Sequence, residues 1–330
     1  MSLRPFGLVV CVTAFAAFAQ AQQYKAPLAS DGQPDLQGFW ANNNATPLER
    51  PKELAEHPVL TDAEVQAMRQ KAEEMFTGKF DAAFGDQIFL TTWANVKGLK
   101  IGFKSTDGET GDYSSEWNDH RVWDNRTSLI TEPADGRFPP LTARAKKLQE
   151  EQSIARQRPA EGPEDRSLGE RCITRGSPQV QAGYQSYYQI VQTPTAVMIM
   201  TEMFHDVRVI NLENRPHVPA AVHEWLGDSR GHWEGHTLVV DTTNYRPRAF
   251  QSISSENLHI TERFTRQDAE TIRYEITVND PDTWTKPWSL TIPLQRSAQP
   301  VYEYACHEGN IGLAGILAGA RADEAKALSK

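Results

Sequence analysis

The chain has 330 residues and is acidic, with 34 lysines and arginines against 43 aspartates and glutamates and a formal net charge of −9. Nucleic-acid binding depends on clustered positive charge, so this balance argues against a nucleic-acid partner. The length allows one large domain or two small ones.

The first 21 residues have the three parts of a cleaved signal peptide. Arg4 supplies a positive start, residues 6–18 form an apolar run, and Ala19 and Ala21 put small residues before a cut at Gln22. The run is too short to span a bilayer. We therefore expect a periplasmic or secreted protein whose mature chain has no membrane span.

A disulfide is expected between the two cysteines of the mature chain, Cys172 and Cys306. Two cysteines in a chain that folds in an oxidising compartment usually pair. Closing so long a loop would stabilise the fold by about 4–5 kcal/mol on the loop-entropy model. A reactive thiol is the alternative.

The N-terminal half is predicted to combine helices, irregular chain and a few short strands. Thr61 and Glu64 form a capping box that begins one helix, and a second helix spans about 142–157. The segments 88–93 and 127–131 are predicted strands.

From about residue 184 the pattern changes to short β-type runs separated by turn residues. The predicted strands are Tyr187–Gln192, Ala196–Met203, Val207–Leu212, Thr237–Thr243, Leu258–Thr265, Thr271–Val278, Ser289–Leu294 and Val301–Cys306. The connections are mostly tight turns, which favours antiparallel neighbours, because parallel strands need helical crossovers that the pattern lacks. A helix of small residues, 311–328, follows.

We predict a mainly β fold, an antiparallel meander barrel of lipocalin-like form, with a two-sheet sandwich as the alternative. Gly38-Phe39-Trp40 matches the short Gly-x-Trp signature of lipocalins, although the meander begins far downstream. The predicted divisions are 1–21 for the signal peptide, 22–165 for a mixed helical and irregular extension that wraps the core, and 166–330 for the barrel domain with its short C-terminal helix.

A glutamate stands out on the predicted strand that begins at Leu258. Alternation puts Leu258, Ile260, Glu262 and Phe264 on one face, so a carboxylate lies on the apolar side. Burial disfavours a charged carboxylate, which suits a general acid or base. The structural alternative is a buried ion pair with a nearby arginine, Arg263, Arg266 or Arg273.

Ionisable residues also interrupt the apolar strands at 202–208. Neighbouring His205 and Asp206 point apart in a regular strand, but a bulge or turn would let them converge. His205 is then a candidate base, Asp206 or Glu262 its partner, and Arg208 a stabiliser of developing negative charge. The alternative is a polar corner between two strands.

The segment from Tyr302 to Asn310 is the densest polar cluster. With Cys306 bridged, Tyr302 and His307 would stand at a strand end on the barrel rim, a reasonable place for a catalytic site. Side chains that would contact a ligand complete the set of candidates: Tyr188, Met203, Trp225 and Tyr304.

Neither a metal nor a cofactor is expected. His232 and His236 have the spacing of helical metal ligands but lie in a predicted turn, where their rings would splay. The sequence has no phosphate loop, dinucleotide fingerprint or Gly-x-Ser-x-Gly elbow. A metal-dependent enzyme stays open as a hypothesis because most of the histidines lie in the β half.

Stretches along the whole mature chain carry a family resemblance. They are Pro34–Trp40, Arg126–Ile130, Asp135–Arg137, Glu170–Cys172, Tyr188–Pro194, His205–Arg208, Trp225–Thr243, Asn257–Arg266, Asp280–Trp288 and Tyr302–Asn310. Together they resemble a large family of exported bacterial proteins of unassigned activity. The resemblance implies export and one coherent domain, and it assigns no catalytic residue. Ile311 departs from the family, where an aromatic is expected after Asn310.

Three functions are compatible with these residues. The first is an exported small-molecule enzyme that uses cofactor-free acid–base chemistry, an elimination, hydration or isomerisation, in a barrel pocket. Glu262 or His205 would be its base, with Arg208 and Tyr302 polarising the substrate, so Glu262→Gln should abolish turnover and leave the fold intact. The second is a lipocalin-like binder of an apolar small molecule. The third is the metal-dependent enzyme.

Overall fold

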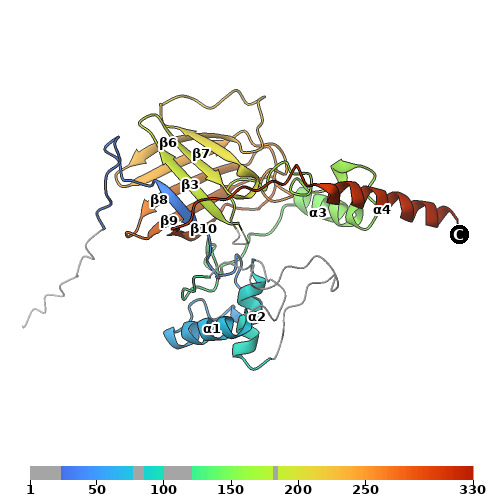
Figure 1. The fold of residues 1–330 in the computed structure, drawn as a ribbon, viewed down its shortest axis with the longest axis horizontal. Coiled ribbons are helices and arrows are strands. Elements are labelled where there is room, and N and C mark those ends of the chain that lie inside the picture. Colours follow the sequence, from blue (N-terminus) through green and yellow to red (C-terminus); the bar gives the residue numbers. More distant parts are fainter. Residues whose placement is uncertain (1–23, 77–84, 100–120, 181–184, 330) are drawn as a thin grey trace, which may run out of the picture.

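The computed structural model describes residues 24–76, 85–99, 121–180 and 185–329, and the expected signal peptide lies outside these ranges. Figure 1 shows a β-barrel, a layer of two helices beside it, and a long C-terminal helix that extends away from the barrel.

Nine strands of the described chain close into a barrel, which confirms the predicted fold class. β1 pairs with both β3 and β10 and so completes the ring. A short strand, β2 (Ile130–Glu132), adds to β10. In order around the barrel the strands are β1 (Gly38–Ala41), β3 (Tyr187–Gln192), β4 (Ala196–Thr201), β5 (Val207–Asn211), β6 (Asp228–Glu234), β7 (Thr237–Thr243), β8 (His259–Arg266), β9 (Thr271–Asn279) and β10 (Trp288–Arg296).

The predicted antiparallel meander is only partly right. Strands β5 and β6 run parallel, while the other neighbouring pairs of the described barrel are antiparallel. Parallel neighbours need a connection that returns along the sheet. The segment 212–227 is that connection.

The closing strand β1 comes from the N-terminal extension, so this part of the chain contributes to the barrel as well as wrapping it. The Trp40 side chain is fully buried, and its indole N–H donates to the Leu36 carbonyl at 2.9 Å. The guanidinium groups of Arg266 on β8 and Arg296 on β10 lie over its ring, 5.0 and 4.8 Å from the ring centre. Trp40 thus joins the closing strand to two others.

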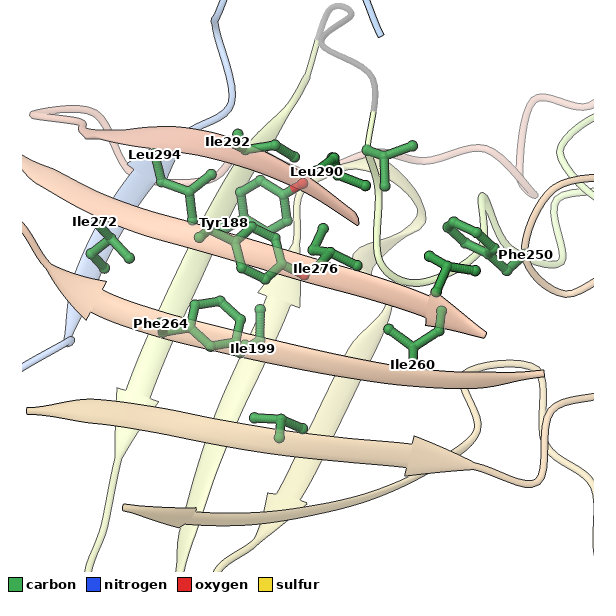
Figure 2. Close-up of a cluster of buried hydrophobic side chains, with 14 of the residues drawn as sticks. Tyr188, Ile199, Phe250, Ile260, Phe264, Ile272, Ile276, Leu290, Ile292 and Leu294 are labelled. Atoms are coloured by element: carbon green, nitrogen blue, oxygen red, sulfur yellow. The ribbon is translucent and has the colours of Figure 1, made fainter. Parts of the chain in front are cut away.

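Side chains fill the barrel interior. On β8 the predicted alternation is confirmed, since Ile260, Glu262 and Phe264 are buried while the residues between them are partly exposed. Figure 2 shows aliphatic and aromatic side chains from opposite sides of the barrel packed together, among them Tyr188, Ile199, Phe264, Ile276, Ile292 and Leu294. The interior is therefore a packed core.

Two helices of the N-terminal extension form a second, smaller core. α1 (Asp62–Met75) begins at the predicted capping box of Thr61 and Glu64, and it packs against α2 (Gln87–Val96). The predicted strand at 88–93 is wrong. Its aromatic and β-branched residues favour a strand locally, but helical spacing lets α2 bury Ile88 and Phe89 against α1, and such packing overrides local propensity.

The C-terminal half follows the prediction except at two strands, since β6 was not predicted and the last predicted strand is absent. Both helices predicted after residue 140 are present, as α3 (Ala143–Arg156) and α4 (Ile311–Leu328). Elsewhere in the described chain there are short 3-10 helices, namely η1 (Lys52–Leu54), η3 (Pro163–Asp165) and η4 (Met203–His205). The predicted strand Val301–Cys306 is wrong, because these residues are irregular chain. β10 pairs with β9 on one side and with β1 and β2 on the other, so no edge is left for another strand.

The C-terminal segment is tied back to the barrel mouth by the predicted disulfide between Cys172 and Cys306, which are 134 residues apart in the sequence. Farther along the chain, the Arg321 side chain of α4 donates to the carbonyl oxygens of Ala160 and Glu161. Within the described ranges, no helix has both the length and the apolar character needed to cross a bilayer.

Replacing Trp40 with alanine should lower the free energy of unfolding by about 3–5 kcal/mol, because it leaves a large cavity and loosens the closing strand. Urea unfolding followed by fluorescence and circular dichroism measures the change. Phe39, partly exposed on the other face of β1, is the matched control, and Phe39→Ala should cost clearly less. Equal losses in the two variants would show that Trp40 does not hold the barrel closed.

Candidate functional site

Arg208 and Glu262 meet inside the barrel. Arg208 on β5 forms a two-bond ion pair with Glu262 on β8, in which Nη2 donates to Oε1 at 2.7 Å and Nη1 donates to Oε2. Both side chains are buried, and Glu262 is completely so. The hydroxyl of Tyr274 on β9 also donates to Glu262. The sequence placed Glu262 inside, but its partner is Arg208 and not one of the arginines nearest to it in the sequence.

This cluster is suited to holding charge and not to exchanging protons. Burial opposes the charge of Arg208, but the attraction of Glu262 outweighs it and raises the pKa of Arg208. Burial and the negative charge of Glu262 raise the pKa of Tyr274. Burial also raises the pKa of Tyr188, whose hydroxyl donates to the Gln179 carbonyl at 3.0 Å. The arginine therefore stays charged and both tyrosines stay protonated.

The cavity beside the ion pair is small, about 20 Å³, and Tyr188, Arg208, Phe264 and Tyr274 are among the residues that line it. That volume is enough for about one water molecule. A small-molecule site usually needs several hundred Å³. The geometry therefore does not support a ligand chamber of lipocalin type inside the barrel.

Asp206 lies where this interior meets the barrel mouth. The hydroxyl of Thr174 donates to its Oδ2 at 2.6 Å, and the backbone N–H of Arg175 donates to its carboxylate. Burial raises the pKa of Asp206, and these two hydrogen bonds only partly offset it. A carboxyl group that keeps its proton above the ordinary range is suited to general acid–base catalysis.

A cleft of about 1250 Å³ opens at the barrel mouth. Its walls are α3, the segment 164–180 and the loop 247–252, together with two of the predicted ligand-binding residues, Met203 and Trp225. Gly176, Pro178 and Gln179 line both the cleft and the small cavity that contains Asp206. The cleft thus adjoins the small cavity lined by Asp206, the one candidate carboxyl whose pKa is raised.

His205 and Asp206 do not converge. The predicted turn is present, with left-handed backbone at Phe204 (φ 66°) and His205 (φ 50°). It directs His205 Nε2 to within 2.9 Å of the Tyr302 backbone carbonyl, while Asp206 contacts Thr174. The proposed base and its partner therefore belong to different surroundings.

The remaining candidates lie on the C-terminal segment outside the barrel. Tyr304 packs against Phe204, with ring centres 5.1 Å apart. The backbone N–H of Tyr302 donates to the buried Glu202 at 3.0 Å, and the Tyr302 ring is exposed. His307 is exposed next to the bridged Cys306. These contacts fasten the segment, and none of these candidates lines the cleft.

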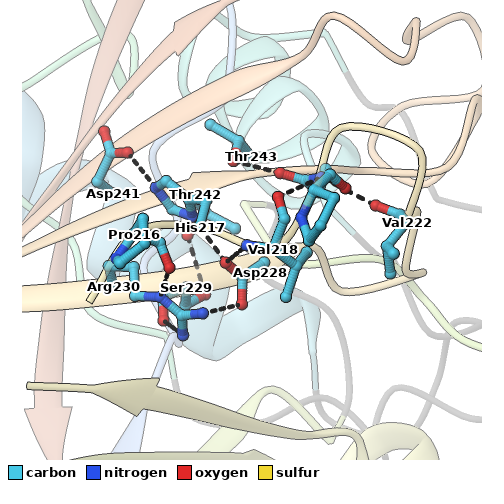
Figure 3. Close-up of polar contacts among 12 residues, drawn as sticks. Pro216, His217, Val218, Val222, Asp228, Ser229, Arg230, Asp241, Thr242 and Thr243 are labelled. Atoms are coloured by element: carbon cyan, nitrogen blue, oxygen red, sulfur yellow. Dashed lines mark hydrogen bonds and ion pairs between the residues drawn. The ribbon is translucent and has the colours of Figure 1, made fainter. Parts of the chain in front are cut away.

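A second polar cluster fastens the crossover segment 212–227 to the outer wall of the barrel. Figure 3 shows His217 between two carboxylates, with Nδ1 2.8 Å from Asp228 on β6 and Nε2 2.9 Å from Asp241 on β7. Arg230 pairs with Asp228 at 2.9 Å, and His259 on β8 also contacts Asp241. Burial opposes the charge of Asp241, but its histidine partners lower the pKa of this carboxyl. The cluster bridges three strands and the crossover.

Across the described ranges, no group of three or more histidine, cysteine, aspartate or glutamate side chains is arranged to hold a metal ion. His232 and His236, whose spacing resembles that of helical metal ligands, are both exposed at the β6–β7 hairpin, where His232 contacts Glu234 at 3.1 Å.

Sequence reasoning missed three parts of this arrangement. Tyr274 was detectable, since it alternates with Ile272 and Ile276 on the buried face of β9. Thr174 has no local signal, because its role depends on the fold that brings it to Asp206. The arginines of the cleft form no recognisable motif, since they are dispersed over a predicted helix, the segment that follows it and a distant loop.

No family model, no curated protein and no solved structure matches this chain.

Glu262→Gln should lower the free energy of unfolding by about 3–5 kcal/mol, because it leaves the buried Arg208 without its counter-ion. This replaces the expectation that the variant keeps its fold. Chemical unfolding measures the loss, and the double change Arg208→Met with Glu262→Leu should recover most of it. Glu234→Gln, which breaks the exposed pair with Arg263, is the control and should have little effect. A stable Glu262→Gln protein would contradict this role.

The raised pKa of Asp206 has a consequence for stability. Between the ordinary carboxyl value of 3.8 and the higher value in the fold, the folded protein binds the Asp206 proton more tightly than the unfolded chain does. The free energy of unfolding of the wild type, relative to that of Asp206→Asn, should therefore fall as the pH rises through this window. Urea unfolding over a pH series measures it, and a difference that is flat or rises with pH would contradict the assignment.

Proposed function

We propose that this chain is an exported small-molecule enzyme that works by cofactor-free acid–base chemistry, with Asp206 as the proton-exchanging group. The observation that supports this most is the setting of Asp206, a carboxyl with a raised pKa that lines a small cavity sharing Gly176, Pro178 and Gln179 with a cleft of about 1250 Å³. Export is supported by the leader pattern of residues 1–21 and by a disulfide, since such bonds persist in oxidising compartments.

We assign the role of base to Asp206 and not to Glu262, because both carboxylate oxygens of Glu262 already accept hydrogen bonds. Its two oxygens accept from Arg208 and from Tyr274 in a fully buried position. Asp206 accepts from the Thr174 hydroxyl at Oδ2 and from the Arg175 backbone N–H, and these two bonds orient the carboxyl. Unlike Glu262, it forms no ion pair with a side chain of the described chain.

The reaction class follows from what one carboxyl group can do. Eliminations, hydrations and isomerisations each need a proton removed from carbon or oxygen and returned nearby, and a single acid–base group can alternate between the two steps. The cleft offers apolar contact at Met203, Trp225 and Phe250 for the body of such a substrate.

A binding protein that uses the same cleft is the second candidate. The observation that favours it is the breadth of the cleft, which exceeds the volume of most small-molecule sites and would hold a ligand without any reaction. Turnover separates the two candidates.

Deuterium uptake from solvent tests the enzyme proposal across many compounds at once, so the substrate need not be identified first. The protein is incubated in D₂O with a library of hydroxy acids, unsaturated acids and sugar acids, together with the neutral amide of each, and masses are followed by mass spectrometry. The wild type should exchange or convert at least one compound, and Asp206→Asn should slow this by about a hundredfold or more.

Glu164→Gln is the matched control, since Glu164 is an exposed carboxylate lining the same cleft. This variant should keep the wild-type rate. A compound that binds with no deuterium uptake would favour the binding protein, and a reaction that proceeds unchanged in Asp206→Asn would remove Asp206 from its role.

A further inference from the structure

The side chains that line the cleft carry more positive than negative charge, whereas the whole protein is acidic. Six arginines and four carboxylates line it, in a chain whose formal net charge is −9. The arginines are Arg156, Arg158, Arg166, Arg171, Arg175 and Arg248, and the carboxylates are Glu151, Glu164, Asp165 and Glu170. Positive charge gathered in a concave site attracts anions even when the rest of the surface repels them.

Most of these arginines are not used by the fold. Arg158 pairs with Glu161, and Arg166 pairs with Glu170. Within the described ranges, the side chains of the other arginines make no hydrogen bond or ion pair: Arg156, Arg171, Arg175 and Arg248. Their guanidinium groups are therefore available to a ligand.

Backbone contact brings two of the available arginines together from distant parts of the sequence. A Cβ placed on Gly176, whose φ is +84°, would lie 2.4 Å from the carbonyl oxygen of Ala249, so the two backbone segments touch at this point. Only glycine permits that approach. The residues directly before the contact are Arg175 on one segment and Arg248 on the other, and both line the cleft.

The same walls are held firmly. Arg248 has left-handed backbone (φ 68°), and its N–H donates to the Ser254 carbonyl at 2.9 Å. A residue other than glycine keeps this conformation only when its surroundings enforce it. Arg171 precedes Cys172, which the disulfide ties to the C-terminal segment. Guanidinium groups on rigid backbone lose less freedom on binding, which favours affinity.

We infer that the ligand of the cleft is a small organic anion, with a carboxylate or phosphate head bound by Arg175 and Arg248 and supported by Arg171. The planar guanidinium fork matches both oxyanions with paired hydrogen bonds. Met203, Trp225 and Phe250 supply apolar contact for the body of the molecule. This inference rests on the proposed function only in taking the cleft as the substrate site.

Three probes of one shape test the inference by isothermal titration calorimetry on the mature protein. Benzoate carries a carboxylate and phenyl phosphate carries a phosphate, the two proposed head groups, and benzamide is the neutral counterpart. At least one anion should bind at least about tenfold more tightly than benzamide, and added salt should weaken that binding. The anion that binds with the higher affinity identifies the head group.

Arg175→Gln and Arg248→Gln should each weaken anion binding about tenfold or more, because each removes one fork of the site. Arg158→Gln is the matched control, since it removes the same charge from the same cleft at an arginine that already has a partner. It should change affinity by less than about threefold.

Four results would overturn the inference: no binding of either anion, equal binding of benzamide, unchanged anion binding in the Arg175→Gln/Arg248→Gln double variant, or an equal loss in Arg158→Gln. The proposed function fails separately. Anions that bind without deuterium uptake would refute the enzyme and support this site, whereas turnover of neutral compounds alone would refute this site and support the enzyme.

Discussion

Closure of the barrel by β1 is the constraint on which the other features depend. Its pairing with β3 and β10 leaves no open edge between them, and arginines of β8 and β10 both lie over the Trp40 ring. Side chains fill the interior of so narrow a barrel, and only about 20 Å³ stays open beside the ion pair. Binding space therefore lies at the mouth, where loops leave the strands.

The buried pair of Arg208 and Glu262 is part of the same constraint. It links β5 to β8, with β9 attached through Tyr274, across the inside of the barrel. Two buried charges are tolerated because each has its partner, and removing one would leave the other without solvation. The pair thus fixes the relative positions of β5 and β8, and Asp206 directly precedes β5.

Contacts between residues far apart in the sequence hold the walls of the cleft together near Asp206. The disulfide fastens the segment that carries Arg171 and Thr174, and Gly176 sets this segment against the loop of Arg248. The far wall is joined through Gln152 of α3, whose side chain donates to the Ser252 carbonyl at 2.8 Å. Proton chemistry and anion recognition are thereby proposed for one place, with separate residues for each.

The sequence by itself determined what depends on local pattern. Alternation found Glu262 on a buried face, the capping box found α1, and turn spacing found a barrel. Tertiary structure decided the rest, because it depends on contacts between distant residues. Local patterns do not show that Gly38–Ala41 closes the ring, that Ile88 packs in a helix, that Arg208 neutralises Glu262, or that Arg175 and Arg248 share a wall. Each is set by which segments meet in space, since period and propensity describe only neighbours along the chain.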